Sequence, residues 1–502
     1  MMAVDETPIP EEAAPPAEQD SLPRRAARGV VWAFAGGLGA RVLDFVKVIV
    51  LARLLAPEDF GLFGIVMLAI VLVVTFTQTG FDMALIQKRG DARAYLDAAW
   101  TVLVIRGAAL AALLFLGAPL VAMFFGEPRV VPLLRVMSGS VLLQGLVNIG
   151  VIYFQKDLEF HKELAYNMLT ALVSLVVGIV LAYRLRSAWA LVWAGLAGAF
   201  VRCVLSYVLH PYRPRPDLDT RRWSELFGFG KWILGNRLLW FCAMQGDDIV
   251  VGRFFGAAAL GIYQVAFRIA NLIATEVPEV LAVVAFPAYA RLQDDMAQAK
   301  RHFLSAFVLT AAVILPMAGF IVVAAGALVE GLLGPHWLAA VPLVQLLAVA
   351  GLGRGMNATM GALLIGVGRP AEVTRVSAIV LIVLAAALVP LGWMWGLAGV
   401  CCAVAVMQWT GTVLLCRLVG RVVDLSWGEL WRPAMHPLIG CVLAGAVALA
   451  TSCLADTSVC KIAWCGSVGL AVYAAYLALA CRYLGCPVLD VGMKFARLLQ
   501  GA

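Results

Sequence analysis

Residues 49–63 read IVLARLLAPEDFGLF, and residues 249–263 read IVVGRFFGAAALGIY. At this offset of 200, four positions are identical and eight more are conservative. The identical pairs are Ile49 and Ile249, Val50 and Val250, Arg53 and Arg253, and Gly61 and Gly261. Because clustered matches at a single offset are typical of an internal repeat, the chain is predicted to contain two copies of one structural unit.

The composition places both copies in a membrane. The chain has 502 residues, of which 63% are hydrophobic and 14% are charged, whereas soluble proteins average about 45–50% apolar and about 25% charged residues. The apolar residues form long unbroken runs, not the alternating segments of about ten residues that are typical of an outer-membrane barrel. The sequence therefore predicts α-helical spans of about 20 residues each.

Fourteen apolar runs are long enough to be such spans. Their approximate cores are 30–52, 61–81, 98–122, 131–152, 164–184, 188–208, 229–251, 260–283, 303–325, 338–366, 374–395, 397–416, 436–454 and 463–481. The run 338–366 contains Arg354 and five glycines, so a bend is expected there. The predicted fold class is an all-α polytopic membrane protein with about 14 transmembrane helices.

The repeat divides these spans into two lobes. Six spans separate the two copies, so the copies have the same orientation and are expected to be related by a pseudo-two-fold axis along the membrane normal. The predicted organisation is a disordered acidic, proline-rich tail (1–24), an N-terminal six-helix lobe (25–210), a basic linker (211–227), a C-terminal six-helix lobe (228–417), helices 13 and 14 (418–485) and a cytoplasmic tail (486–502). Secondary transporters place their substrate pathway between such halves, although duplication of a scaffold that transports nothing is an alternative.

The basic residues predict the orientation of the spans. With both termini in the cytoplasm, inner segments hold 23 of the 38 Lys and Arg residues and outer segments hold six, as the positive-inside rule requires. The net charge of +7 then needs no nucleic-acid partner. The sequence has no GxxxxGK[ST] motif, so ATP is not expected to be the direct energy source.

Ionisable residues inside the spans are the candidate functional residues, because each costs roughly 3 kcal/mol or more in the hydrocarbon unless it faces water or a partner. The first span carries Arg41, Asp44 and Lys47, the seventh carries Arg237, Asp247 and Asp248, and the eighth carries Arg268. The three residues of the first span follow an i, i+3, i+6 spacing, which places them on one helix face.

Lys47 and Asp247 occupy equivalent positions in the repeat. A pseudo-two-fold axis brings equivalent positions face to face, so their opposite charges suggest a gate or latch near the outer end. The alternative for the first span is a local ion pair between Arg41 and Asp44 that only neutralises both groups.

Other charged residues are assigned to structural roles. Isolated arginines in spans 3, 4 and 6 (Arg106, Arg135 and Arg202) are expected to contact backbone carbonyls or neighbouring helices. Arg53 and Arg253 lie at outer helix ends, where snorkelling to the headgroups is expected. Glu58 and Asp59 fall in an outer loop, where membrane glycosyltransferases use acids, but their PEDFG context also suits helix capping.

Four strings carry a resemblance to a known family: GARVLDFVKVIVLARLLAPEDFGLFGI (39–65), FTQTGFDMALIQK (76–88), FGFGKWILGNRLLWFCAMQGDDIVVGRFFGAAALGIYQVAFRI (227–269) and FPAYARLQDD (286–295). They resemble the Wzx-like oligosaccharide flippases of the multidrug/oligosaccharidyl-lipid/polysaccharide (MOP) exporter superfamily. The resemblance implies a transporter, not an enzyme, in the bacterial inner membrane. It would move undecaprenyl-diphosphate-linked repeat units from the cytoplasmic to the periplasmic leaflet by alternating access, for exopolysaccharide or lipopolysaccharide assembly.

Arginine forks bind phosphate in a bidentate manner, so Arg41, Arg237 and Arg268 are the predicted diphosphate and glycan ligands. Asp44, Asp247 and Asp248 are candidate sites for coupling to a proton or sodium gradient, and no cofactor or metal is expected. The implied partners are a polymerase and a chain-length regulator. The alternatives are a drug/cation antiporter, which would favour an acidic cleft, and a polysaccharide polymerase or glycosyltransferase, which would favour a large outer loop.

Overall fold

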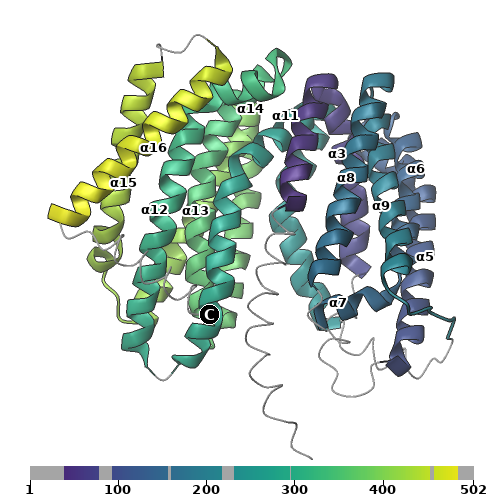
Figure 1. The fold of residues 1–502 in the computed structure, drawn as a ribbon, viewed down its shortest axis with the longest axis horizontal. Helices are drawn as coiled ribbons and strands as arrows, with labels where there is room; N and C mark the ends of the chain where they lie inside the picture. Colours follow the sequence, from purple (N-terminus) through teal and green to yellow (C-terminus); the bar gives the residue numbers. More distant parts are fainter. Residues whose placement is uncertain are drawn as a thin grey trace, which may run out of the picture.

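The computed structural model describes residues 39–77, 93–156, 160–217, 231–293, 295–452 and 457–483. Within these residues, ten helices are long and apolar enough to cross a membrane, and they stand side by side (Figure 1). The predicted all-α polytopic fold is confirmed. The two predicted tails and residues 218–227 of the predicted linker lie outside the described residues.

The long helix α11 (Lys231–Arg291) is a hairpin of two spans. Its chain reverses at Gly256, whose φ of 86° and ψ of 178° suit glycine. The Tyr263 hydroxyl donates a hydrogen bond of 2.5 Å to Asp247, although 16 residues of straight helix would separate them by about 24 Å. The predicted spans 7 and 8 are therefore the two antiparallel arms of α11.

Helix α14 (Pro370–Val422) is a second hairpin, reversed at Gly396 with φ 61°. A Cβ placed on Gly399 would lie 1.8 Å from the carbonyl oxygen of Leu391, which a straight helix would place about 12 Å away. These two reversals, the helix at 39–54 and the shorter α6 (Val130–Gly145) account for the predicted spans beyond the ten.

The helices form two groups. The first contains helix 39–54, α3 (Pro57–Thr77), α5 (Arg93–Phe125), α6, α8 (Phe160–Leu185) and α9 (Trp189–Leu209), with the short η1 (Ile149–Val151) and α7 (Ile152–Lys156) between α6 and α8. The second contains α11, α12 (Met296–Leu328), η2 (Val329–Leu333), η3 (Pro335–Ala340), α13 (Val341–Gly366) and α14. We call these groups the first and second lobes; they lie side by side, and α11 and α3 meet between them (Figure 1).

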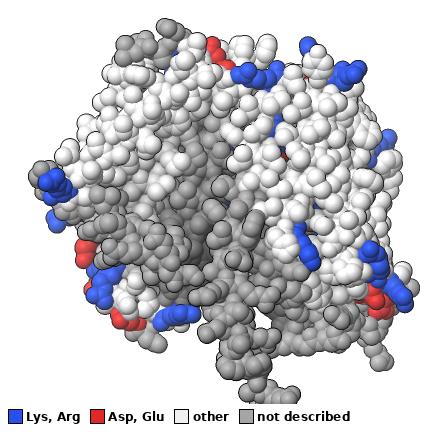
Figure 2. All heavy atoms as spheres, viewed as in Figure 1, with Lys and Arg blue, Asp and Glu red and all other residues white. Residues whose placement is uncertain are grey.

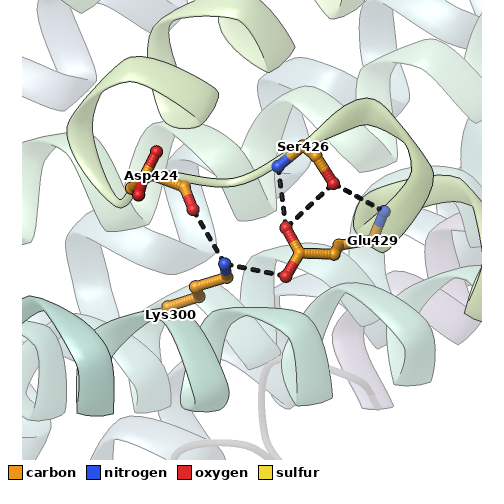
Figure 3. A network of polar contacts seen from close by, with 4 residues as sticks. All are labelled: Lys300, Asp424, Ser426 and Glu429. Atoms are coloured by element: carbon orange, nitrogen blue, oxygen red, sulfur yellow. Dashed lines mark hydrogen bonds and ion pairs between the residues drawn. The ribbon is translucent and has the colours of Figure 1, made fainter.

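Helices α15 (Trp427–Thr451) and α16 (Ser458–Tyr483) pack on the outer edge of the second lobe against α12 (Figure 1). A polar network fixes the start of α15 (Figure 3). Lys300 of α12 donates to the Asp424 carbonyl at 2.7 Å and to the Glu429 carboxylate at 2.9 Å. Ser426 and Glu429 complete a capping box. The network therefore ties the first turn of α15 to α12.

The surface is that of a multi-pass membrane protein. Large apolar side chains are highly exposed, including Trp393, Leu116 and Met123, and such exposure over a wide area indicates contact with lipid. On the face drawn in Figure 2, most of the charged side chains lie toward the margins, and most of the described atoms between them are uncharged.

The two lobes meet where the repeat predicted an axis. A Cβ on Gly61 would lie 1.7 Å from the Ala257 carbonyl oxygen, and one on Gly261 would lie 1.9 Å from the Pro57 carbonyl oxygen. Ala257 is the repeat equivalent of Pro57, so these are the same contact made twice. Two glycines allow this close crossing of α3 and α11. We call this end of the molecule, which holds residues 52–61, 252–261 and 331–337, the closed end.

Candidate functional site

A cavity of about 1010 Å³ lies between the lobes. Its walls come from helix 39–54, α3, α6, α8 and α9 on the first-lobe side, and from α11 and α13 on the second-lobe side. This volume is at the upper end of the roughly 300–1,000 Å³ that is typical of small-molecule sites. The cavity is therefore large enough for a polar headgroup of several units.

Charged side chains line the cavity on both sides. Four are cationic (Lys47, Arg202, Arg268 and Arg354) and three are acidic (Asp44, Asp247 and Asp248). Five of these seven residues are candidates that the sequence analysis selected. Helix 39–54 also carries the predicted Arg41, but Arg41 is not among the described residues that line the cavity. Arg237 lies on the α11 helix, and its side chain is outside the described residues.

Asp44 and Lys47 form an ion pair on helix 39–54. The Lys47 Nζ lies 2.6 Å from Asp44 Oδ1, and it also donates to the Ser174 hydroxyl of α8 at 3.3 Å. The Asp44 side chain remains 55% exposed, and it attracts Arg268 of the second lobe. The local neutralisation of Asp44 therefore involves Lys47, while Arg268 supplies a longer-range attraction between the lobes.

Asp247 is held by its own lobe. It is 5% exposed, accepts the Tyr263 hydroxyl at 2.5 Å and accepts the backbone N–H of Asp248 at 3.0 Å. Arg354 adds an electrostatic attraction. Because Lys47 donates to Asp44 and Tyr263 donates to Asp247, the gate between Lys47 and Asp247 stays a prediction.

Asp248 adds a second carboxylate to the same wall. It interacts with Gln264, whereas its Oδ1 atom is buried with no hydrogen-bond partner among the described residues. Two carboxylates on successive residues, one with an unsatisfied oxygen, form an arrangement that favours a bound cation or a proton. In the described part of the chain, no three His, Cys, Asp or Glu side chains are grouped as a metal site.

Two cavity arginines were not among the ligands predicted from the sequence, although Arg354 was recognised as a charge within the run 338–366. The Arg354 guanidinium lies 4.8 Å from the centroid of the Phe267 ring, and that of Arg202 lies 5.1 Å from the Tyr166 ring. A cation over an aromatic face is attracted by the ring, which helps to hold it in place. Arg202 was expected to serve structural contacts only, and its place in the cavity wall makes it a candidate ligand. By contrast, Arg106 donates to the Val74 carbonyl at 3.1 Å, as predicted.

The closed end is held by contacts between the lobes. Arg53 Nε donates to the Leu332 carbonyl at 2.8 Å, and its Nη2 donates to the Gly331 carbonyl. The Trp337 indole N–H donates to the Ala52 carbonyl at 2.8 Å. The Trp337 ring also packs edge-on against Phe60, with centroids 5.3 Å apart.

The expectation that Arg53 snorkels to the headgroups is therefore wrong. The π-helical turn η2 ends in carbonyls that lack intrahelical partners and carry partial negative charge, and Arg53 satisfies two of them. Its repeat equivalent Arg253 makes a weaker contact with the other lobe, over the Phe124 ring at 5.7 Å.

The acidic pair in the PEDFG turn has a structural role. Asp59 accepts the backbone N–H groups of Ala56 at 3.1 Å and Ala188 at 2.8 Å, which caps the start of α3 and ties it to the start of α9. Glu58 pairs with Arg129 at 2.5 Å. Neither acid lines the cavity, in agreement with capping.

A family model described as "Polysaccharide biosynthesis protein" matches residues 50–342. The teichuronic acid biosynthesis protein TuaB of Bacillus subtilis (strain 168) is 23% identical over 70% of this chain and 73% of its own length. The succinoglycan biosynthesis transport protein ExoT of Rhizobium meliloti (strain 1021) is 26% identical over 64% of this chain and 65% of its own. The lipopolysaccharide biosynthesis protein WzxC of Escherichia coli (strain K12) is 23% identical over 70% of this chain and 71% of its own.

Solved structures share the fold. The lipid II flippase MurJ in an inward closed conformation has a TM-score of 0.73 at 13% identity, covering 91% of this chain and 99% of that one. An inward-facing multidrug resistance MATE family transporter of the MOP superfamily has a TM-score of 0.62 at 15% identity, covering 77% of this chain and 96% of that one. At these identities the likeness concerns the arrangement of the helices.

Proposed function

The chain belongs to the polysaccharide biosynthesis protein family as a Wzx-like flippase, a transporter and not an enzyme, and we propose that it translocates undecaprenyl-diphosphate-linked oligosaccharide repeat units. The proposed direction is from the cytoplasmic to the periplasmic leaflet of the bacterial inner membrane, by alternating access. The product would serve exopolysaccharide or lipopolysaccharide assembly. The observation that carries the proposal is the large charged cavity between two repeated lobes.

The charges of the cavity suit a diphosphate. Its four cations outnumber its three acids, and Asp44 is already paired with Lys47. Arg268 and Arg354 of the second lobe can bind phosphate oxygens through charge-assisted hydrogen bonds, and Arg202 of α9 is a further cationic residue in the cavity wall. Arg41 and Arg237 stay candidate ligands. The isoprenoid tail would remain in the bilayer, because only the headgroup needs shelter from the hydrocarbon.

Both termini are proposed to be cytoplasmic, as the distribution of Lys and Arg predicts. The closed end then faces the periplasm. In alternating access, the contacts of Arg53 and Trp337 with the opposite lobe would break as the cavity opens to that side. The moving bodies would be the predicted N-terminal lobe (25–210) and C-terminal lobe (228–417).

An ion gradient is the proposed source of energy. Asp247 and Asp248 are the strongest candidates for the coupling site, because they are adjacent, lie at the cavity wall and include one unsatisfied carboxylate oxygen. Asp44 remains a third candidate. A drug/cation antiporter would also use such acids, but the excess of cations in the cavity favours an anionic headgroup.

Deletion of the gene in its host tests this function. We expect lipid-linked repeat units to accumulate on the inner leaflet while their synthesis continues, and the plasmid-borne chain to restore export. The proposed polymerase and chain-length regulator would then lack substrate in the periplasm. Normal export in the deletion strain would overturn the proposal.

A further inference from the structure

We propose that the two walls of the cavity divide the headgroup between them: the α6 and α8 wall of the first lobe binds the glycan, and the second-lobe wall holds the diphosphate. This inference rests on the proposed function and adds a subsite to it. It is carried by the different chemistry of the α6 and α8 surface, which has no charged residue among the described residues that line the cavity, and of the two arginines on the second-lobe wall.

The α6 and α8 part of the first-lobe wall displays neutral hydrogen-bonding groups, whereas the first-lobe charges Asp44, Lys47 and Arg202 lie on helix 39–54 and α9. Gln144 of α6 and Asn167, Thr170 and Ser174 of α8 line the cavity. Among the described residues, the side-chain amides of Gln144 and Asn167 have no hydrogen-bond partner, and neither side chain is buried. Each amide offers two donors and an acceptor. The α6 and α8 wall therefore presents unpaired hydrogen-bond donors and acceptors to the cavity.

The second-lobe wall carries four charged groups beside its own neutral ones. Asp247, Asp248 and Arg268 of α11 and Arg354 of α13 line it. Arginines match phosphate oxygens in charge and geometry. Sugar hydroxyls are neutral groups that both donate and accept, so amides and hydroxyls can pair with them without the large desolvation cost of an unpaired charge. The amides and hydroxyls of α6 and α8 thus fit the glycan, and the second-lobe arginines fit the diphosphate.

The first-lobe wall also has room for a sugar ring. Ala171 of α8 and Ala194, Gly195, Gly198 and Ala199 of α9 line the cavity next to the polar residues. The Cβ positions of Gly195 and Gly198 are covered by Met137 and Ser174, so the space beside Asn167 and Thr170 is the part bordered by the alanines. A ring lying there would contact backbone-flanked small residues and place its hydroxyls near the amides.

Such a wall would select among glycans. A site built to hydrogen-bond a substrate group discriminates strongly against an analogue without that group, because the buried partners of the site are left unpaired. Gln144 and Asn167 would then set which repeat unit is accepted, whereas Arg268 and Arg354 would bind any isoprenoid diphosphate.

Binding to the purified full-length chain in nanodiscs tests the division. The two probes are undecaprenyl diphosphate without sugar and the lipid-linked repeat unit extracted from the host's deletion strain. The variants Gln144→Met and Asn167→Leu keep side-chain volume and remove the amides, singly and together. Gln298→Met, on α12 and away from the cavity, is the matched control, and Arg268→Ala with Arg354→Ala tests the other wall.

We expect the wild-type chain to bind the glycan-bearing lipid more tightly than undecaprenyl diphosphate. The double amide variant should reduce this preference by about tenfold or more and leave undecaprenyl diphosphate binding unchanged, as the control should for both probes. The double arginine variant should weaken binding of both lipids. The division of the walls would be overturned if the double amide variant kept the wild-type preference, or if it lost affinity for both lipids equally. It would also be overturned if the wild-type chain showed no preference. The flippase function would remain intact in each of these cases. If the wild-type chain bound neither lipid, the proposed function itself would fail.

Discussion

Gly61 and Gly261 lie back to back where α3 crosses α11, and each is packed against the first turn of the helix that carries the other: Gly61 against Ala257, Gly261 against Pro57. The two positions are equivalent in the repeat, so the pseudo-two-fold axis passes between them. The crossing lies at the closed end, beside the hydrogen bonds of Arg53 and Trp337. It is therefore the point about which we expect the lobes to part.

Gly61→Ala should open the closed end. The added methyl would lie 1.7 Å from a backbone carbonyl oxygen that cannot rotate away, and overpacking of this kind costs about 1–3 kcal/mol. We expect a cavity cysteine introduced by Ala171→Cys to react several-fold faster with an impermeant maleimide added to whole cells, as measured on its peptide by mass spectrometry. Gly117→Ala is the matched control, because nothing lies within 4 Å of a Cβ there. Equal labelling of both variants would contradict the role of the crossing.

Arg53→Ala should also favour the open state, since it removes two hydrogen bonds from the closed end. Hydrogen bonds from a charged donor contribute about 1.5–3 kcal/mol. The same maleimide assay should show faster labelling, whereas Arg253→Ala, which loses only a contact over the Phe124 ring, should have a smaller effect. If Arg253→Ala accelerated labelling as much as Arg53→Ala, the two hydrogen bonds of Arg53 would not be what holds the closed end together.

Arg268→Ala and Arg354→Ala should each lower export by about tenfold or more, because each removes a charge-assisted contact to the diphosphate. Export is measured as surface polysaccharide in a complemented deletion strain, with protein abundance checked in the same membranes. Arg135→Ala is the control, since Arg135 lies over the Phe115 ring and is absent from the described cavity wall. If Arg135→Ala lost export while Arg268→Ala and Arg354→Ala kept it, the assignment of Arg268 and Arg354 as diphosphate ligands would be refuted.

Charge exchange tests the gate between Lys47 and Asp247. Lys47→Asp and Asp247→Lys should each abolish most export, because each places two like charges on facing walls. The double exchange should recover part of it if the two side chains meet during the transport cycle. No recovery would leave Lys47 as the partner of Asp44 and Asp247 as the acceptor of Tyr263, as they are in this conformation.

Much of the fold could be predicted because it depends on regular patterns. Run length and the offset of 200 indicated the spans and their division into two lobes, and the glycine-containing breaks after residues 251 and 395 marked the two hairpins. The reversals at Gly256 and Gly396 occupy a single residue each, which explains why α11 and α14 are continuous in length yet each contains two spans.

The site was predicted less completely, because it depends on which helix faces which. Clustered charges on the first, seventh and eighth spans could be recognised by their spacing, and five of them line the cavity. Arg202 is the lone charge of its span and shows no pattern, so its position beside Tyr166 follows only from tertiary packing. The acceptors of Arg53 could not be predicted either, because the free carbonyls of η2 belong to a π-helical turn, and no residue type predicts such a turn.

Transfer of the headgroup across a bilayer tests the central claim most directly. The purified chain is reconstituted into vesicles with the extracted lipid-linked repeat unit, and periodate outside the vesicles oxidises every glycan that reaches the outer leaflet. With the wild-type chain, under an imposed proton or sodium gradient, oxidation should continue past the pool that was already outside, and the double variant of Arg268→Ala with Arg354→Ala should stop at that pool. If oxidation with the wild-type chain stopped at the outer pool under both the proton and the sodium gradient, the proposed transfer of the headgroup would be contradicted.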